Sequence, residues 1–145
     1  MKFLSLIFLT VLLGKGCDSA QEQDLANAVV EYSANTRGFF YKITIQNKKV
    51  EITRDRRGQN KPATLTMSDA DWNELVAEFK TVNLDGLSTL KAPTELRFHD
   101  GAAMANLKVT YKEKEYTSSE FDDGHPPAEI EKLVNRITKY KPTRE

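Results

Sequence analysis

This chain of 145 residues lacks most of the sequence patterns that identify enzymes. It contains one cysteine and two histidines, and it has no G-x-S-x-G, H-E-x-x-H, C-x-x-C or glycine-rich phosphate-binding motif. A single cysteine forms no internal disulfide. No apolar run reaches the ~20 residues that a membrane-spanning helix needs. Catalytic groups can also be assembled in space, so these absences argue against an enzyme without excluding one. We therefore predict no catalytic residues, no bound metal and no cofactor.

The chain also lacks an excess of charge of either sign, with 21 basic and 21 acidic residues. If Lys2 and Lys15 are removed with a signal peptide, 19 basic and 21 acidic residues remain. This balance gives no reason to expect a nucleic-acid partner. Eight basic residues and two acidic ones lie between Arg37 and Lys61. That run predicts either a solvated loop or a basic patch for an anionic glycan, a lipid headgroup or a protein.

The N-terminus has the features of a secretory signal peptide. Lys2 supplies a positive charge, and Phe3 to Leu13 form an apolar run of the length typical of the hydrophobic region of such a peptide. Gly14-Lys15-Gly16 would suit an ordinary signal peptidase. The same residues with Cys17 resemble a lipobox, the signal at which bacteria cut before a cysteine and lipidate it. Gly16 and Cys17 match that pattern, whereas Gly14 and Lys15 depart from it.

Lipidation would explain why the chain keeps one cysteine. A lone exposed thiol is a liability outside the cell, and a thioether to lipid removes it. We therefore predict a signal peptide over residues 1–16 and a lipid on Cys17 that ties the protein to the membrane. Residues 17–28 are polar and acidic and would form a tether. The expected location is the bacterial cell envelope, in the periplasm or on the cell surface.

Residues 29–145 are expected to form one α+β domain. Period-two alternation and turn residues predict an antiparallel sheet of about five to six strands, with one polar face. The candidate strand segments are Val29–Ser33, Phe39–Gln46, Val50–Asp55, Ala63–Met67, Thr94–His99, Ala103–Tyr111 and Glu115–Phe121. The residues expected on the polar face are Lys42, Thr44, Thr53, Arg97, His99, Lys108, Thr110, Thr117 and Ser119.

Two amphipathic helices are expected to cover the other face of the sheet, giving a two-layer fold. The first begins after Ser68, a good N-cap, and the second opens at Pro127. Their apolar faces consist of Trp72, Leu75, Val76, Phe79 and Val82 in the first helix, and of Ile130, Leu133, Val134 and Ile137 in the second.

The most distinctive internal stretch is FDDGHPP, residues 121–127. Asp122, Asp123 and His125, with His99 and Asp100, are weak candidates for a binding or metal site. The alternative is structural. The two aspartates and Gly124 suit a turn, and the two prolines fix the chain before the helix.

The chain as a whole resembles small bacterial lipoproteins of unknown function. The likeness covers about residues 29–140 and rests on three stretches: MSDADWNELV, APTELRFHDGAAMANLKV and FDDGHPPAEIEKLVNRI. It implies no activity, cofactor or catalytic residue. The function expected is a lipid-anchored extracytoplasmic binding module. The alternatives are an inhibitor of an envelope hydrolase that presents the 122–127 turn, or a metal-dependent hydrolase using His99, Asp100, Asp123 and His125.

Overall fold

The segments with alternating apolar and polar residues pair into one antiparallel sheet. The computed structural model describes residues 24–143, so the expected signal peptide, Cys17 and most of the expected tether lie outside the described residues. The fold is α+β, and the sheet has seven strands, one more than the upper end of the expected range. The strands are β1 (Ala28–Asn35), β2 (Phe40–Gln46), β3 (Lys49–Thr53), β4 (Ala63–Thr66), β5 (Met104–Tyr111), β6 (Lys114–Thr117) and β7 (Phe121–Asp122).

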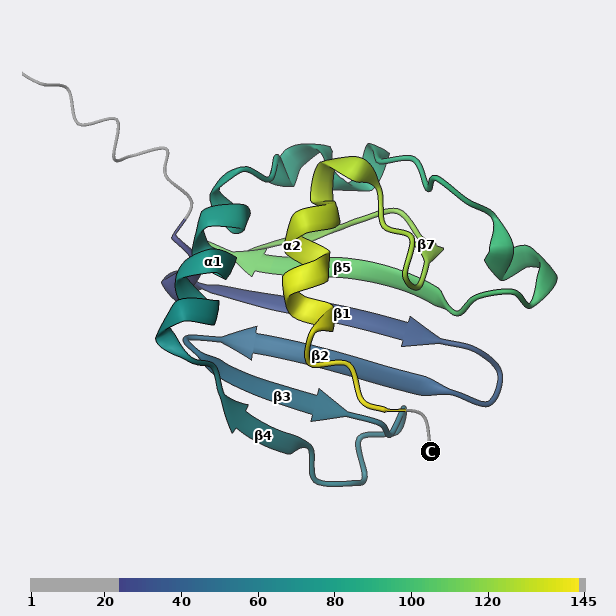
Figure 1. Cartoon of the computed structure of the whole chain (residues 1–145), viewed down its shortest axis with the longest axis horizontal. Helices are drawn as coiled ribbons and strands as arrows, with labels where there is room; N and C mark the ends of the chain where they lie inside the picture. The colour runs from purple at the N-terminus through teal and green to yellow at the C-terminus, as the bar shows by residue number, and fades with distance from the viewer. Residues whose placement is uncertain (1–23, 144–145) are drawn as a thin grey trace, which may run out of the picture.

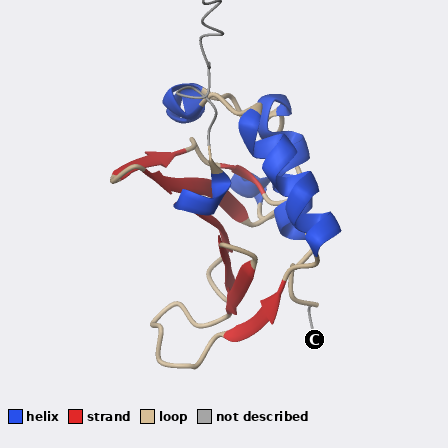
Figure 2. Ribbon diagram, turned by 90° about the vertical axis from the view of Figure 1, so that its left-hand side faces the viewer, coloured by secondary structure: helices blue, strands red, loops and turns tan. Residues whose placement is uncertain are grey.

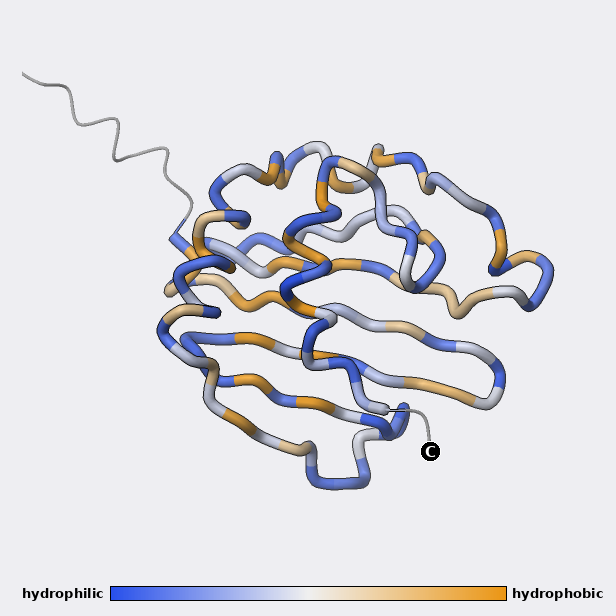
Figure 3. Tube along the Cα trace, in the orientation of Figure 1, coloured by the Kyte–Doolittle hydropathy of each residue, from blue (hydrophilic) through white to orange (hydrophobic). Residues whose placement is uncertain are grey.

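The sheet is built outward from β1. The strand order is β4-β3-β2-β1-β5-β6, and β7 pairs with one end of β5. Val30 lies between Ile45 of β2 and Val109 of β5, so apolar residues line up across neighbouring strands. One face of the sheet thereby becomes the hydrophobic core. Figure 3 shows the apolar and polar residues that alternate along the strands. The buried strand residues on this face are Ala28, Val30, Tyr32, Ala34, Tyr41, Ile43, Ile45, Val50, Ala105, Leu107, Val109 and Tyr111.

Both predicted helices lie on this apolar face, which confirms the two-layer arrangement (Figures 1 and 2). Helix α1 (Asp69–Lys80) begins after Ser68, whose hydroxyl accepts a hydrogen bond of 3.1 Å from the backbone N–H of Asp71. Helix α2 (Glu131–Thr138) follows a short 3-10 helix (Ala128–Ile130). Among residues 24–143, no helix is long and apolar enough to cross a bilayer. The helix residues expected in the core that are fully buried are Leu75, Phe79, Ile130, Leu133, Val134 and Ile137.

Two-residue turns close two hairpins of the sheet. Asn47 and Lys48 join β2 to β3 with φ angles of 46° and 66°, and Lys112 and Glu113 join β5 to β6 with φ angles of 49° and 63°. Two consecutive residues with positive φ form the turn whose twist matches that of the flanking strands. Both turns lie at the end of the sheet where β1 starts, because β1 pairs Ala28 with Tyr111 and Val30 with Ile45.

The strand predicted over Thr94–His99 is wrong. Leu96–His99 form a 3-10 helix, so Arg97 and His99 are not on the polar face of the sheet. The backbone N–H groups of Leu96 and Arg97 donate to the carboxylate of Asp122 instead of to a neighbouring strand. The alternating pattern at 94–99 therefore does not reflect strand pairing.

The strand predicted over Glu115–Phe121 is broken in two, β6 and β7. Ser118 lies between them and is buried, where its hydroxyl accepts a hydrogen bond of 2.9 Å from the N–H of Leu107. Its neighbour Ser119 donates its hydroxyl to the carbonyl of Leu90. Ser119 is therefore tied to a loop rather than exposed on the polar face of the sheet. Thr117, the last residue of β6, is exposed.

Candidate functional site

Asp122 lies at the end of β7 and is fully buried, with 0% of its side chain exposed. Its carboxylate accepts hydrogen bonds from the Thr94 hydroxyl at 2.5 Å and from the backbone N–H groups of Leu96 and Arg97 at 2.7 and 3.0 Å. The Arg97 guanidinium adds a charge-assisted bond of 3.0 Å. Burial by itself raises the pKa of Asp122, but these donors outweigh it and hold the pKa well below its usual range. Asp122 thus fixes loop 94–99 to the sheet.

Arg97 completes this arrangement beneath an exposed loop. Its side chain is 10% exposed, and its guanidinium also donates to the carbonyl of Thr94 at 2.9 Å. The guanidinium carbon lies 4.3 Å from the centre of the Phe98 ring. Phe98 itself is 64% exposed and Leu96 is 41% exposed. The buried Arg97–Asp122 pair therefore holds a loop that carries two apolar side chains at the surface.

Asp123 points to different partners from those of Asp122. One of its carboxylate oxygens accepts the hydroxyls of Tyr32 and Tyr41, each at 2.8 Å, and the other accepts the Lys141 ammonium at 2.5 Å. Only 3% of the Asp123 side chain is exposed. Burial and the nearby negative charge of Asp123 both raise the pKa of Tyr32. The Tyr32 hydroxyl therefore stays protonated and donates its hydrogen bond to Asp123. The four side chains join β1, β2, the 122–125 turn and the C-terminal segment.

The remaining predicted site residues do not join the two aspartates in one cluster. His99, Asp100 and His125 are exposed. Asp100 adopts a left-handed conformation with φ of 57° at the end of the 3-10 helix Leu96–His99. Within the described part of the chain, no group of three or more His, Cys, Asp or Glu residues is placed to hold a metal ion. The carboxylates of Asp122 and Asp123 are fully engaged by the groups named above.

Sequence reasoning did not identify Thr94, Arg97, Tyr32, Tyr41 or Lys141 as partners of these aspartates. Tyr32 and Tyr41 carry a usable signal, because their strand positions face the core. A buried tyrosine hydroxyl needs a hydrogen-bond partner. That rule predicts an acceptor under the sheet but does not say which residue supplies it.

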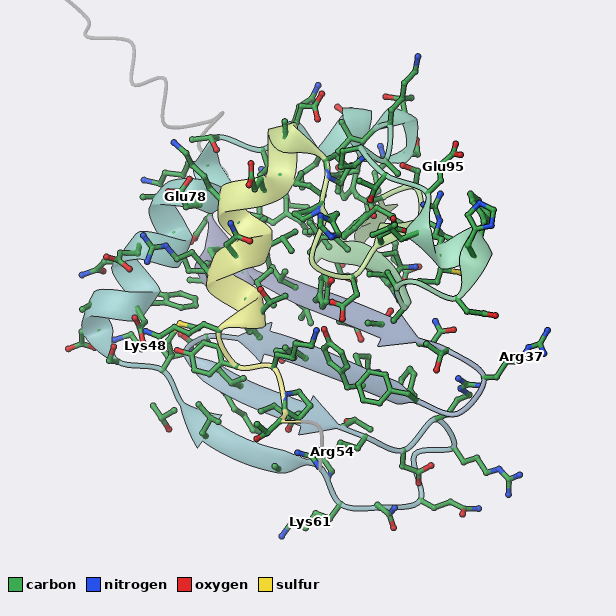
Figure 4. The ribbon with its side chains drawn as sticks, turned by 45° about the vertical axis from the view of Figure 1, so that its right-hand side comes forward. Arg37, Lys48, Arg54, Lys61, Glu78 and Glu95 are labelled. Carbon is green, nitrogen blue, oxygen red and sulfur yellow. The ribbon has the colours of Figure 1, made fainter. Side chains whose placement is uncertain are left out.

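The basic run Arg37–Lys61 is divided between the two ends of the sheet (Figure 4). Lys48 and Lys49 lie at the end where β1 starts, and they pair with Asp69 at 2.7 Å and with Glu51 at 2.5 Å. Lys42 lies on the polar face and pairs with Glu31 at 3.4 Å. The other five basic residues lie at the opposite end, and we call them the cationic end: Arg37, Arg54, Arg56, Arg57 and Lys61.

Four surface clefts surround the cationic end. The largest, about 470 Å³, lies between the loop after β3 and the C-terminal segment, and Arg54 and Lys61 line it. A second cleft of about 420 Å³ is lined by Phe39, Phe40 and Arg54. The other two measure about 360 and 340 Å³, and Arg56 and Arg57 line both. These clefts are shaped by residues from the β1–β2 hairpin, the β3–β4 loop and residues 140–143.

No protein-family model matches the chain, and no curated protein matches it significantly.

Proposed function

We propose that this protein is a lipid-anchored extracytoplasmic binding module. The apolar run Phe3–Leu13 followed by Cys17 supports the anchor, since a signal peptide cut before a lipidated cysteine has this order. In that case seven residues separate the lipid from Leu25, the first buried residue of the domain. A tether of seven residues spans at most ~25 Å, so the domain would stay close to the membrane.

The cationic end is the observation that carries the binding function. It gathers five basic side chains around four open clefts. The carboxylates of Asp122 and Asp123, by contrast, are engaged in holding the fold together. A domain whose two candidate aspartates are engaged in the fold and whose open clefts are lined by arginine and lysine is suited to binding rather than to acid–base chemistry.

Metabolic labelling with radioactive palmitate tests the anchor. We expect cells expressing the full chain to label the wild type and the Ser19→Ala control, and Cys17→Ala to abolish the label. The wild type should fractionate with membranes. A label that persists in Cys17→Ala, or an unlabelled wild type released in soluble form, would contradict lipidation at Cys17.

The hydrolase-inhibitor alternative has one specific support. The 122–125 turn is held rigidly by two buried aspartates, and the following Pro126 and Pro127 are also buried. This turn therefore offers only Gly124 and His125 to a partner. If the protein inhibits an envelope hydrolase through this turn, His125→Ala should abolish inhibition in a panel of purified cell-wall hydrolases. Unchanged inhibition by that variant would remove the alternative.

A further inference from the structure

The loop that follows β3 is ordered by its only acidic residue. The Asp55 carboxylate accepts hydrogen bonds from the backbone N–H groups of Arg57, Gln59 and Asn60 at 2.8, 2.6 and 3.0 Å. These bonds, led by that from Arg57, lower the pKa of Asp55 below its ordinary value. The carboxylate therefore stays charged and is committed to the turn, which leaves its hydrogen-bonding capacity largely satisfied.

The basic side chains around this loop are of two kinds. Arg56 donates to the carbonyl of Thr36 at 2.7 Å and lies 5.9 Å from the centre of the Phe40 ring, while Arg54 donates to the carbonyl of Thr143 at 3.4 Å. These contacts fix two guanidinium groups but do not neutralise them.

The other three basic side chains have no polar partner among the described residues. Arg37, Arg57 and Lys61 form no side-chain hydrogen bond or ion pair within residues 24–143. Arg37 and Lys61 point away from the body of the domain in Figure 4. The cationic end thus has five positive charges that no carboxylate pairs with in the described part of the chain.

The clefts at the cationic end adjoin one another. Arg54 lines three of the four, and Phe40 lines three of the four. Among the described residues, Asp55 is the only acidic one that lines any of these clefts, and its carboxylate is satisfied as described. A shallow band that runs around the end of the sheet, positive along its length, fits an extended ligand with repeated negative charges better than one compact molecule.

We propose that the cationic end binds an anionic polysaccharide. Arginine is suited to the carboxylate, sulfate or phosphate groups that such polymers carry, because its planar guanidinium binds oxyanions through two parallel N–H donors. The partner is not expected to be a protein, because protein interfaces usually have an apolar centre. The exposed large apolar side chains among residues 24–143 are Leu65, Leu96 and Phe98, and none of them lines these clefts.

The choice of a polysaccharide over membrane lipid rests on the proposed function. β1 starts at Ala28, next to the tether, and ends at Asn35, next to the β1–β2 hairpin that carries Arg37 (Figure 1). Eight strand residues span about 25 Å. In a domain tied at the start of β1, the cationic end therefore lies about one strand length from the point of attachment, which favours a ligand beyond the bilayer that holds the lipid.

Binding of alginate, a polymer of uronic acids, tests this proposal. Full-length protein purified in detergent is titrated with alginate, with neutral dextran, with poly-glutamate and with phosphatidylglycerol vesicles. The test variant combines Arg37→Gln, Arg57→Gln and Lys61→Gln, which removes three charges that form no hydrogen bond or ion pair within residues 24–143. The control variant combines Lys91→Gln, Lys112→Gln and Lys132→Gln, which removes the same charge elsewhere.

We expect alginate to bind and dextran not to bind. The test variant should bind alginate at least ~10-fold more weakly, and the control variant should bind within about twofold of the wild type. Added salt should weaken the wild type more than the test variant. Equal loss in both variants, or no alginate binding, would overturn the proposal. Stronger binding to poly-glutamate or to the vesicles would assign the surface to an acidic protein or to a membrane.

The outcome is independent of the anchor. Detergent-solubilised protein can bind alginate whether or not Cys17 carries lipid, and palmitate labelling does not require ligand. Failure of this proposal and failure of the proposed anchor are therefore distinguishable.

Discussion

The turn at 122–125 and the cationic end differ in what their charges do. In the turn, two carboxylates are buried and accept seven hydrogen bonds between them. At the cationic end, five basic groups surround open clefts, and the carboxylate of Asp55 accepts three backbone N–H groups of its own loop. The distinctive FDDGHPP sequence therefore stabilises the fold, whereas the basic residues of the cationic end form no ion pair within residues 24–143. The two regions differ in exposure, and sequence distinctiveness alone does not reveal that difference.

Among the substitutions that compare the two regions, Asp122→Ala should lower the free energy of unfolding the most. This change leaves Arg97 buried without its carboxylate and leaves the Leu96 and Arg97 N–H groups without an acceptor. Removing one partner of a buried ion pair costs about 3–5 kcal/mol of unfolding free energy. Urea denaturation measures it. Asp85→Ala is the control, because Asp85 is exposed and pairs with Lys114 at 3.4 Å, and exposed pairs contribute about 0–1 kcal/mol. Equal losses in the two variants would contradict the structural role of Asp122.

Asp123→Ala should have the next largest effect. It removes the acceptor shared by the hydroxyls of Tyr32 and Tyr41, which both lie in the core. An unsatisfied buried hydroxyl costs about 1–3 kcal/mol, so we expect a loss of about 1–3 kcal/mol in urea denaturation. If the hydroxyls cause the loss, Asp123→Ala should cost less in a Tyr32→Phe, Tyr41→Phe background. The same cost in both backgrounds would show that the two hydroxyls are not involved.

The pH dependence of stability tests Asp122 without removing its side-chain volume. The pKa of Asp122 is lowered in the folded protein. Its contribution is therefore complete above the unfolded-state value of about 3.9, and it is lost as the pH falls from there toward the folded-state pKa. The urea midpoint of Asp122→Asn, which cannot titrate, should lie well below that of the wild type at pH 7. The gap should narrow below about pH 4. A constant gap from pH 7 to pH 2 would exclude this titration.

The smallest effect on stability should come from the cationic end. Replacing Arg37, Arg57 and Lys61 together by Gln should change the free energy of unfolding by no more than about 0.5 kcal/mol, because these exposed side chains form no hydrogen bond or ion pair within residues 24–143. Circular dichroism during thermal unfolding provides the measurement. A loss of several kcal/mol would mean that these charges, like the two aspartates, hold the fold together.

The regular parts of the fold follow from local sequence signals. Period-two alternation identified the strands around β1, and Asn47-Lys48 and Lys112-Glu113 mark hairpin turns whose geometry depends on neighbouring residues alone. The apolar spacing of Leu133, Val134 and Ile137 likewise identified the buried side of α2. These features depend on contacts within a few positions, or on one periodic pattern.

What the sequence-based prediction got wrong or missed depends on contacts between residues that are far apart in the chain. Leu96 and Arg97 leave strand geometry because their N–H groups meet a carboxylate about 25 positions later in the chain. The acceptor for Tyr32 likewise comes from residue 123. The distribution of the basic residues 37–61 between the two ends of the sheet could have been predicted from the sequence. A hairpin at Asn47-Lys48 places Lys48 and Lys49 at one end of β3 and Arg54 at the other.

Our proposal places binding at the cationic end and not at the 122–127 turn. It is tested most directly by the dissociation constant for alginate of three full-length proteins: the wild type, the Arg37→Gln, Arg57→Gln, Lys61→Gln variant, and His125→Ala. We expect alginate to bind the triple variant at least ~10-fold more weakly than the wild type, and to bind His125→Ala as tightly as the wild type. Unchanged affinity in the triple variant, or weakened affinity in His125→Ala, would place the binding site elsewhere.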